Sequence, residues 1–521
     1  MQSFKLSFKG HVYPRKSDSS TTLPLSNSDT RSSLSRFSLT RRCTRLLMGL
    51  ILVCLFVFFS RTKATAPFRL QELSLAEEHS LPPLYEEYHD YERHLPQHNL
   101  SLPFPEGRDA KFFWAANHVT ISGWGNAMQE LVMNAALSHV TKRTFVFDNF
   151  TWERDAPDYS TFNGKLIPSR IPLSAIISGP IIGSSFPPGD AAPRAVSREY
   201  FKEVCPNPTI IDSWVVNEHL RLDDNVPALE IFEKWVERLN SIDDPCVEIR
   251  QESYQLFEIW LFGSRRILSM WPILSKSPIL TDFSWSPLIY QAYAENAHLF
   301  TPTSSSFGFL PSFIRPSGQQ QTSTPLHDIH PVVKSQEMDT IPGLLALHIR
   351  RGDFAGHCSH LANWSSNWNG FNQFSALPDK FRVPTDGGWG VTTEANMNMY
   401  FKACFPTIEQ IVEKVQNVLA DQRRLYGPVK ELKSIYVMTN GDVEWLKQLK
   451  EALMQVKKWD AVVTSRDMKL SWEAKPVAQA VDMLIGQRAQ VLIGNGFSSL
   501  TSNIVMLRML MDIPSEDTRF W

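Results

Sequence analysis

The sequence predicts an α/β protein of two Rossmann-like lobes facing a cleft, with an N-terminal transmembrane helix. Three observations indicate this class. Residues 336–521 alternate short apolar strands with helices, a pattern typical of a parallel sheet covered by helices. A β-turn-α-β unit begins near residue 111. An unbroken run of 14 apolar residues occupies positions 46–59.

The N-terminal region is basic and the rest of the chain is acidic. Residues 1–45 carry nine Lys or Arg and two Asp, a net charge of +7, whereas the whole chain of 521 residues carries −2. This near-neutral total argues against an obligate nucleic-acid-binding protein. Basic residues before the apolar run predict a cytoplasmic tail (1–45), a signal anchor (46–60) and a body in the lumen of the endoplasmic reticulum or Golgi.

A cleaved signal peptide is the alternative, because 14 apolar residues also fit its central region. An A-x-A-like sequence at 64–66 resembles a cleavage site. The long preceding tail and the Pro that follows this sequence count against cleavage. We therefore expect a type II membrane protein.

Four cysteines lie in the expected lumenal body: Cys205, Cys246, Cys358 and Cys404. An even number in an oxidising compartment allows two disulfides with three possible connectivities. Proximity in the sequence favours 205–246 and 358–404. The spacings match no C-x-x-C pattern, so no zinc site is expected.

The body divides into a stem and two lobes. Residues 61–110 are rich in Pro, Glu and His without a sustained apolar period, and predict a stem. We place an acceptor lobe at 111–335, including a flexible segment at 301–328 with four prolines. A sugar-nucleotide lobe follows at 336–521. Three N-x-S/T sequons, at Asn99, Asn149 and Asn363, fit a glycosylated body.

Periodicity predicts the elements of each lobe. In the first lobe we expect a helix after the Gly-rich turn at 123–126, a strand at 143–147, and helices at 227–240 and 253–270. In the second lobe the expected strands are 344–349, 434–438, 461–464 and 491–493. The helices expected there are 397–419, 442–456, 477–487 and 499–511.

The sharpest motif is GLLALHIRRGDF at 343–354, in which a buried strand ends in His348, Arg350, Arg351 and Asp353. Ligands of open α/β sheets bind at the carboxyl ends of strands, and the planar donor fork of Arg suits phosphate oxygens. The alternative is that both arginines simply pair with nearby carboxylates. An adhesion role for the Arg-Gly-Asp tripeptide is disfavoured, because three residues are too few to indicate it.

Two further motifs follow the same logic. At 491–510 a strand enters Gly-Asn-Gly and a helix opens with Ser498 and Ser499, where helix amides and hydroxyls could bind an anion; ordinary helix capping is the alternative. The turn at 123–126, GWGN, permits close backbone approach. It lacks the third glycine of a dinucleotide fingerprint, and no P-loop motif occurs. The chain also lacks a D-x-D triplet, which leaves Arg and helix dipoles to stabilise a diphosphate.

Together these motifs resemble the GDP-fucose-dependent fucosyltransferases of the protein O-, α1,2- and α1,6-linking superfamily. The resemblance rests on GWGN, on HIRRGD at 348–353, and on a segment from Asp482 through Asn495 to Ser498 and Ser499. It covers roughly 111–150 and 340–510. It implies a GT-B fold and inverting, metal-independent transfer from GDP-fucose, with no cofactor beyond the donor substrate.

The resemblance also implies roles for single residues. Arg350 would be the essential arginine on the β-phosphate, and His348 would lie near the guanosine. Arg351 and Asp353 would support that loop. Ser498 and Ser499 would hold phosphate oxygens, and Asn495 belongs to the same nucleotide-binding segment. Asp482 would lie near the nucleotide, where it could contact the guanine. Asn126 would lie near acceptor and diphosphate.

The general base departs from the family pattern. One branch of the family has a catalytic Glu three residues before the Asn, where this chain has Gly123. Glu130 and Asp148 are the local candidates, of which we prefer Glu130; either could instead be a solvated surface acid. A transferase for another GDP-sugar, and an inactive membrane-tethered glycan-binding or scaffold protein, are the alternative functions. The acceptor, a glycan or glycoprotein, is left open.

Overall fold

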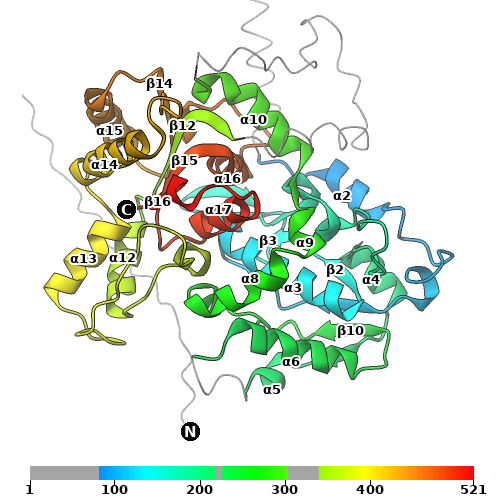
Figure 1. Cartoon of the computed structure of the whole chain (residues 1–521). Helices are drawn as coiled ribbons and strands as arrows, with labels where there is room; N and C mark the ends of the chain where they lie inside the picture. Colours follow the sequence, from blue (N-terminus) through cyan, green and yellow to red (C-terminus); the bar gives the residue numbers. More distant parts are fainter. Residues whose placement is uncertain (1–80, 219–224, 303–339) are drawn as a thin grey trace, which may run out of the picture. The chain divides into compact units, whose positions relative to one another are not determined.

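The computed structural model describes residues 81–218, 225–302 and 340–521 (Figure 1). The predicted membrane anchor at 46–60 lies outside the described residues, as does the segment 301–328 apart from its first two residues. In these three described ranges, no helix combines the length and apolar character needed to cross a membrane.

The fold contains two five-stranded sheets, and every strand pair in both is parallel. The first sheet has the order β8-β2-β1-β10-β9, and the second has the order β14-β13-β12-β15-β16. The strands of the first sheet are β1 (Phe112–Ala115), β2 (Thr144–Phe147), β8 (Val196–Ser197), β9 (Thr209–Ile211) and β10 (Cys246–Ile249). Those of the second sheet are β12 (Ile341–Ile349), β13 (Ser434–Thr439), β14 (Ala461–Thr464), β15 (Ala489–Gly494) and β16 (Thr518–Phe520). The predicted mixed α/β class with parallel sheets is confirmed.

Both faces of the second sheet are buried, which explains its continuous apolar strands. One face of β12 (Leu345, Leu347, Ile349) packs in a cluster with α14 (Ile408–Tyr426) and α15 (Val443–Val456). Its other face belongs to a larger core that includes α16 (Ala478–Arg488) and α17 (Ser499–Leu510). Side chains alternate between the faces with the period of two that a strand requires.

The first sheet shares this larger core through α3 (Trp124–Thr141). Phe113 and Phe145 pack on the α3 side, whereas Phe112 and Trp114 face a separate cluster with α4 (Arg198–Val204). Helices α3 and α17 contact each other directly, and Figure 1 shows both in the middle of the described fold. The two sheets are therefore joined through α3, which follows β1, and α17, which follows β15.

Two predicted helices are interrupted. The region 253–270 holds α7 (Ile259–Phe262) and a 3-10 helix (Arg265–Met270), because Ser264 caps the second segment by accepting a bond from the amide of Arg266. The region 397–419 divides into α13 (Glu394–Cys404) and α14, because Pro406 cannot donate an amide and Thr407 and Gln410 form a capping box. Both expectations of a continuous helix were wrong.

Part of the predicted stem belongs to the folded unit that spans residues 79–521. Residues 86–93 form α2, in which Tyr88 is buried. The hydroxyl of Tyr85 donates to the carbonyl of Glu473 at 2.7 Å, and Trp472 Nε1 donates to the carbonyl of Leu81 at 2.8 Å. Periodicity could not reveal these contacts because their partners are almost 400 residues away in the sequence.

The remaining elements are short or lie in the connections. The helices are α5 (Ser213–Asn217), α6 (Ala228–Asn240), α8 (Trp271–Leu274), α9 (Pro278–Thr281), α10 (Pro287–Phe300) and α12 (Phe354–Asn363). Three antiparallel strand pairs are formed by β3 (Phe150–Thr151) with β6 (Arg170–Ile171), β4 (Tyr159–Phe162) with β5 (Lys165–Pro168), and β7 (Ile177–Ser178) with β11 (Ser284–Trp285).

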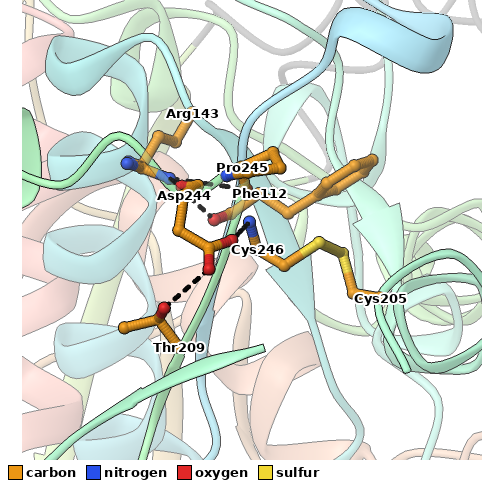
Figure 2. The surroundings of a disulfide bond; sticks show 7 residues. All are labelled: Phe112, Arg143, Cys205, Thr209, Asp244, Pro245 and Cys246. Carbon is orange, nitrogen blue, oxygen red and sulfur yellow. Dashed lines mark hydrogen bonds between the residues drawn. A yellow bond between two sulfur atoms is a disulfide. The ribbon is translucent and has the colours of Figure 1, made fainter. Parts of the chain in front are cut away.

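Both favoured disulfides, Cys205–Cys246 and Cys358–Cys404, are present. The first joins the end of α4 to the start of β10 (Figure 2). Beside it, Asp244 accepts from the Cys246 amide at 2.9 Å and from Thr209 Oγ1 at 2.7 Å. The buried Arg143 donates to several carbonyls in this corner, including that of Asp244. The Cys205–Cys246 disulfide therefore fixes the N-terminal end of β10 to the end of α4.

Candidate functional site

The strand order of the second sheet reverses at β12. The chain proceeds from β12 through β13 to β14 on one side, and returns to β15 and β16 on the other. In open α/β sheets, the helices on the two sides of such a reversal leave a crevice beyond the carboxyl ends of the two strands, here β12 and β15, and ligands bind in it. The motif at 348–353 follows β12 and the motif at 494–499 follows β15, so the two lie at this crevice.

His348 is the last but one residue of β12, and its side chain is buried. Its Nδ1 lies 2.7 Å from Thr501 Oγ1 on α17, and its main-chain carbonyl accepts from Trp521 Nε1 at 2.8 Å. Burial, and then the charge of Arg350, lower the pKa of His348 to about 3. The imidazole is therefore neutral at physiological pH and fixes β12 against α17.

Arg350 is the first residue beyond β12, and its guanidinium is only weakly neutralised. It lies 4.5 Å from the ring centroid of Phe354, and its only ion pair among the described residues is a long one of 4.0 Å to Asp353. Its buried Nε has no hydrogen-bond partner in the described part of the chain. Burial lowers the pKa of Arg350, but an arginine keeps its proton at neutral pH. This cation can therefore accept an anion as a new partner.

Arg351 has a different environment from its neighbour. Its guanidinium lies between the rings of Phe405 and Trp445, each 4.2 Å from its carbon, and donates to the carbonyl of Pro406. The side chain is buried, and burial lowers its pKa to about 10. The contacts of Arg351 hold the chain that follows Cys404.

Asp353 lies at the start of α12. Asn440 joins it to the arginine pair, donating from Nδ2 to Asp353 Oδ1 at 3.1 Å and to the Arg351 carbonyl at 3.0 Å. Oδ1 of Asn440 in turn accepts from the Arg351 amide at 2.8 Å. The loop that presents Arg350 is therefore held by the turn after β13.

The N-terminus of α17 faces the same crevice. Ser498 is the cap residue, but its side chain makes no capping bond, so the first amides of the helix lack that partner. Asn495 is fully buried; it donates to the Cys404 carbonyl at 2.7 Å and accepts from the Phe497 amide at 3.0 Å. Asn495 therefore shapes the loop, while the amide end of α17 carries partial positive charge.

The N-terminus of α3 meets the N-terminus of α17. The carbonyl of Gly125 accepts from Asn503 Nδ2 at 2.7 Å, and a Cβ on Gly125 would lie 2.7 Å from Ser499 Oγ. Only glycine permits this approach. Asn126, next in the chain, donates to Ser122 Oγ at 2.8 Å. Two helix N-termini from the two halves of the fold thus converge beside the β12 motif, as an anionic ligand would require.

Glu130 lies on a different side of α3 from Gly125 and Gln129, which contact α17. It lines a cavity of about 40 Å³ between α3 and the first sheet, together with His118 and Asn134. Its Oε2 accepts from the Val119 amide at 2.6 Å, while Oε1 is buried without a partner among the described residues. Burial raises the pKa of Glu130 to about 8. In this structure Glu130 is a neutral acid that is not brought together with Arg350.

The other acid of this region, Asp148, also lines the cavity. It forms an ion pair with Arg198 at 3.0 Å, and its side chain is only 9% exposed. The adjacent Asn149, which begins a sequon, is itself buried. A solvated surface acid is therefore not an apt description of Asp148 or of Glu130.

Asp482 lies on α16, beside the middle of β13 rather than at its end. It accepts from Tyr436 Oη at 2.6 Å and from Ser465 Oγ at 3.0 Å. Burial raises the pKa of its carboxyl to about 6. These contacts link α16 to β13 and to the segment after β14, and none of them involves Arg350 or Ser498.

Sequence reasoning did not identify Thr501, Phe354, Asn503 or His118. Thr501 and Asn503 lie one turn beyond Ser498, so helical spacing from the serine motif could have indicated them. Phe354 directly follows Asp353 in the motif, so its cation–π contact with Arg350 could have been predicted. No sequence pattern indicated His118, because it lies in an irregular loop before the GWGN turn. Within the described ranges, no group of three His, Cys, Asp or Glu side chains is arranged to hold a metal ion.

Comparisons with known proteins give distant structural matches only. No family model matches the sequence, and no curated protein matches it. A crystal structure of POFUT1 in complex with GDP-fucose has 14% identity and a TM-score of 0.42, covering 77% of this chain and 95% of the other. NodZ alpha-1,6-fucosyltransferase soaked with GDP-fucose has 11% identity and a TM-score of 0.35, covering 77% and 92%.

A third match is a mutant of Arabidopsis thaliana FUT1 in complex with GDP. It has 8% identity and a TM-score of 0.34, covering 82% of this chain and 78% of the other. The solved structures named here are thus all fucosyltransferases, and the similarity is one of fold.

Proposed function

We propose that this chain transfers fucose from GDP-fucose to a hydroxyl of a glycan or protein. One observation carries the proposal: a weakly neutralised arginine, Arg350, and the amide end of α17 lie at the crevice where the second sheet reverses its strand order. The two motifs involved are the ones that resemble the fucosyltransferase superfamily. A diphosphate needs such a concentration of positive charge, because the rest of the chain is acidic.

In this proposal the fold is of the GT-B type. The second sheet and its helices bind the donor, and the first sheet and α3 bind the acceptor. The close contact between Gly125 and α17 lets one diphosphate meet both helix N-termini. The body is placed in the lumen of the Golgi or endoplasmic reticulum, behind a type II anchor at 46–60. The apolar run, the basic tail and the two disulfides support this location.

The chemistry follows from where charge develops. As the bond between fucose C1 and the phosphate oxygen lengthens, negative charge grows on the β-phosphate. Arg350 and the amides and hydroxyls at Ser498 and Ser499 meet this charge, so they bind the transition state more tightly than the ground state. An acceptor hydroxyl attacks the opposite face of the sugar and inverts C1; GDP departs with the electrons of the broken C1–O bond, and the hydroxyl proton passes to water as the new bond forms. No divalent cation is assigned, since the chain lacks a D-x-D triplet.

On the acceptor side of the proposed site, the residues of α3 carry less charge than those proposed to bind the diphosphate. Asn126 stands at the start of α3, and its side-chain carbonyl could accept from the attacking hydroxyl. Glu130 is neutral and faces away from α17, so its use as a base would require the first turns of α3 to rearrange. An oxocarbenium-like transition state lowers the need for a strong base, because the leaving group departs early.

The test is calorimetry and transfer assays on the full-length protein. We expect GDP and GDP-fucose to bind, and Arg350→Ala to lower transfer by about 100- to 1000-fold, the usual cost of removing a group that stabilises transition-state charge. The melting temperature should stay close to that of the wild type. Arg424→Ala is the matched control, because the Arg424 side chain is 75% exposed and forms its ion pair with Asp421 of the same helix.

Each other result has a definite meaning. Near-normal turnover of Arg350→Ala would sink the assignment of Arg350. Preference for GDP-mannose over GDP-fucose would make the chain a transferase for another GDP-sugar. Failure of the wild type to bind GDP would instead indicate a membrane-tethered glycan-binding or scaffold protein.

A further inference from the structure

Three tryptophans from separate segments form an exposed cluster, which we call the tryptophan corner: Trp260 on α7, Trp364 after α12, and Trp389 in the loop before α13. Trp389 is 72% exposed and Trp260 is 56% exposed. Trp364 and Trp389 stack nearly parallel, with centroids 5.7 Å apart and planes at 11°. Trp260 stands nearly perpendicular to both, at 84° and 74°. Trp364 and Trp389 therefore lie parallel to each other, and the ring of Trp260 stands across both.

The exposed Trp389 is held in place rather than left loose. Gly388 and Val391 exchange main-chain hydrogen bonds of 3.1 and 3.0 Å, and Gly390 has φ +78°, as the third residue of a type II turn requires. The Gly390 amide donates to the Asn363 carbonyl at 2.7 Å, which fixes the tip against the residue that precedes Trp364. A rigid, exposed aromatic side chain loses little entropy on binding a partner.

The corner is continuous with the proposed donor site along one face of α12. The Arg350 guanidinium lies over Phe354, and the Phe354 ring lies 4.9 Å from that of His357. The rings of His357 and Trp364 are 6.5 Å apart. Because Phe354 and Trp364 are ten residues apart, the path from the start of α12 to the corner is about 15 Å long. A partner that extends over several sugar units could reach from the corner to the reacting centre.

The chemistry of the corner favours a neutral, hydroxyl-rich partner. A pyranose ring presents C–H groups on its faces, which pack on aromatic rings, and hydroxyls around its edge. In the described part of the chain no Lys or Arg lies over the corner rings, and their indole N–H groups donate to no described residue. The imidazole of His360 stacks on Trp364, with ring centroids 5.4 Å apart. The indole donors can bond to hydroxyls. An acidic partner would instead need Arg or Lys there.

From this geometry we infer that the tryptophan corner binds the acceptor, and that the acceptor is a neutral oligosaccharide chain. This inference rests on the proposed function for the identity of the reaction, but the binding itself does not. Sugar units distant from the attacking hydroxyl stack on Trp364, Trp389 and Trp260, while the terminal unit enters the crevice beside Arg350. Recognition at the corner anchors the acceptor and orients it along α12.

The first experiment measures binding without donor. Full-length protein is titrated with chitohexaose, cellohexaose, a xyloglucan heptasaccharide and a desialylated biantennary N-glycan, by calorimetry and saturation-transfer NMR. We expect at least one of the four to bind, and Trp389→Ala and Trp260→Ala each to weaken it at least tenfold. Trp214→Ala is the control, since Trp214 is also exposed, at 40%, but lies outside the corner. Lack of binding by all four, or equal loss in the control, overturns the inference.

The second experiment separates the corner from the proposed donor chemistry. In transfer assays with the oligosaccharide that binds, corner variants should raise the acceptor KM at least tenfold, with kcat within twofold and unchanged GDP affinity. Wild-type protein that binds the oligosaccharide but not GDP contradicts the proposed function and leaves the corner supported. Wild-type protein that transfers fucose with an acceptor KM insensitive to Trp389→Ala overturns the corner alone.

Other occupants give distinct results. A dimer in light scattering that Trp389→Ala dissociates would show that a second copy covers the corner. Sedimentation with phosphatidylcholine vesicles that needs Trp389 would show a membrane surface. Oligosaccharide binding that appears only in Asn363→Gln would show that a glycan on that neighbouring sequon fills the site. Each of these overturns the assignment of an acceptor chain.

Discussion

Asn503 donates a hydrogen bond of 2.7 Å to the carbonyl of Gly125, and so joins the first turn of α3 to α17. The bond is fully buried and spans 378 positions of sequence. It connects the helix after the first strand of one sheet to the helix after β15 of the other. This bond therefore helps to fix the two helix N-termini that form the candidate anion site, together with the bond from Gln129 to Ser502.

The first prediction concerns the close approach at Gly125. Gly125→Ala would place a methyl group 2.7 Å from Ser499 Oγ and 2.8 Å from the Leu500 amide nitrogen, so α3 and α17 must separate. We expect a loss of about 1–3 kcal/mol in the free energy of unfolding, together with weaker GDP binding. Urea denaturation and calorimetry measure the two effects.

Gly123→Ala is the matched control for Gly125→Ala. A Cβ at Gly123 meets nothing within 4 Å, and Gly123 has an ordinary φ of −68° as the cap residue of α3. Its unfolding free energy and GDP affinity should match the wild type. Equal effects of the two substitutions would show that the contact with α17 is not what the methyl group disturbs.

The second prediction separates the two adjacent arginines by stability. Arg351→Ala removes a guanidinium packed between Phe405 and Trp445 and leaves the Pro406 carbonyl without its donor. We expect the unfolding free energy to fall by about 2–4 kcal/mol, whereas Arg350→Ala, with a side chain 31% exposed, should change it by less than about 1 kcal/mol.

Thermal and urea unfolding of the two arginine variants, in parallel with donor binding, is the measurement. Arg351→Ala should keep a measurable GDP affinity at temperatures where it is folded. A result in which Arg351→Ala is stable but loses donor binding would mean that Arg351 itself touches the nucleotide.

The third prediction is a pH dependence that arises at Glu130. Burial raises the pKa of Glu130 in the folded protein to about 8, from its ordinary value of 4.5. Between these values the folded protein keeps a proton that the unfolded chain has released, so this group makes stability fall as pH rises. The loss is at most about 1.4 kcal/mol for each pH unit, and it ends above about pH 8.

Glu130→Gln isolates this effect, because an amide keeps the acceptor for the Val119 amide but does not titrate. The variant should match the wild type near pH 4 and, relative to it, become progressively more stable from about pH 4.5 to pH 8. Urea denaturation at several pH values measures the difference. A difference that does not vary with pH would show that Glu130 does not titrate in this range.

The fourth prediction concerns the sequons. Asn149 and Thr151 are buried at 8% and 3% exposure, because they lie at the cavity beside α3, whereas Asn99 is exposed in a turn closed by Ser101. We expect a glycan on Asn99 and none on Asn149 in protein made in a eukaryotic cell. Glycopeptide mass spectrometry after N-glycanase treatment in heavy-oxygen water gives the occupancy of each site.

Asn99→Gln should remove one glycan mass step, and Asn149→Gln should remove none. A glycan on Asn149 in folded, active protein would contradict the packing around α3. Absence of glycans from all three sequons would contradict the proposed lumenal location.

Local patterns in the sequence determined much of this protein. Between β12 and α17, apolar runs and helical periods predicted the strands and most helices of the second sheet within a few residues, because both faces of that sheet are buried and its strands are short and apolar. They did not predict α12 or the break between α13 and α14. The pairing of the four body cysteines by proximity was also correct. The polar residues that follow β12 and β15 could be predicted as a site, because parallel strands present their carboxyl ends at one edge.

Only the tertiary structure decided what each of those residues contacts. Arg350 and Arg351 are identical neighbours in sequence, yet one faces the crevice and the other lies between two aromatic rings. Glu130 was a plausible base by spacing, but helix geometry turns it toward the first sheet, where burial keeps it neutral. Trp260, Trp364 and Trp389 are distant in sequence, and only folding brings their rings together. Sequence patterns record local conformation, whereas side-chain environment depends on contacts between residues far apart in the chain.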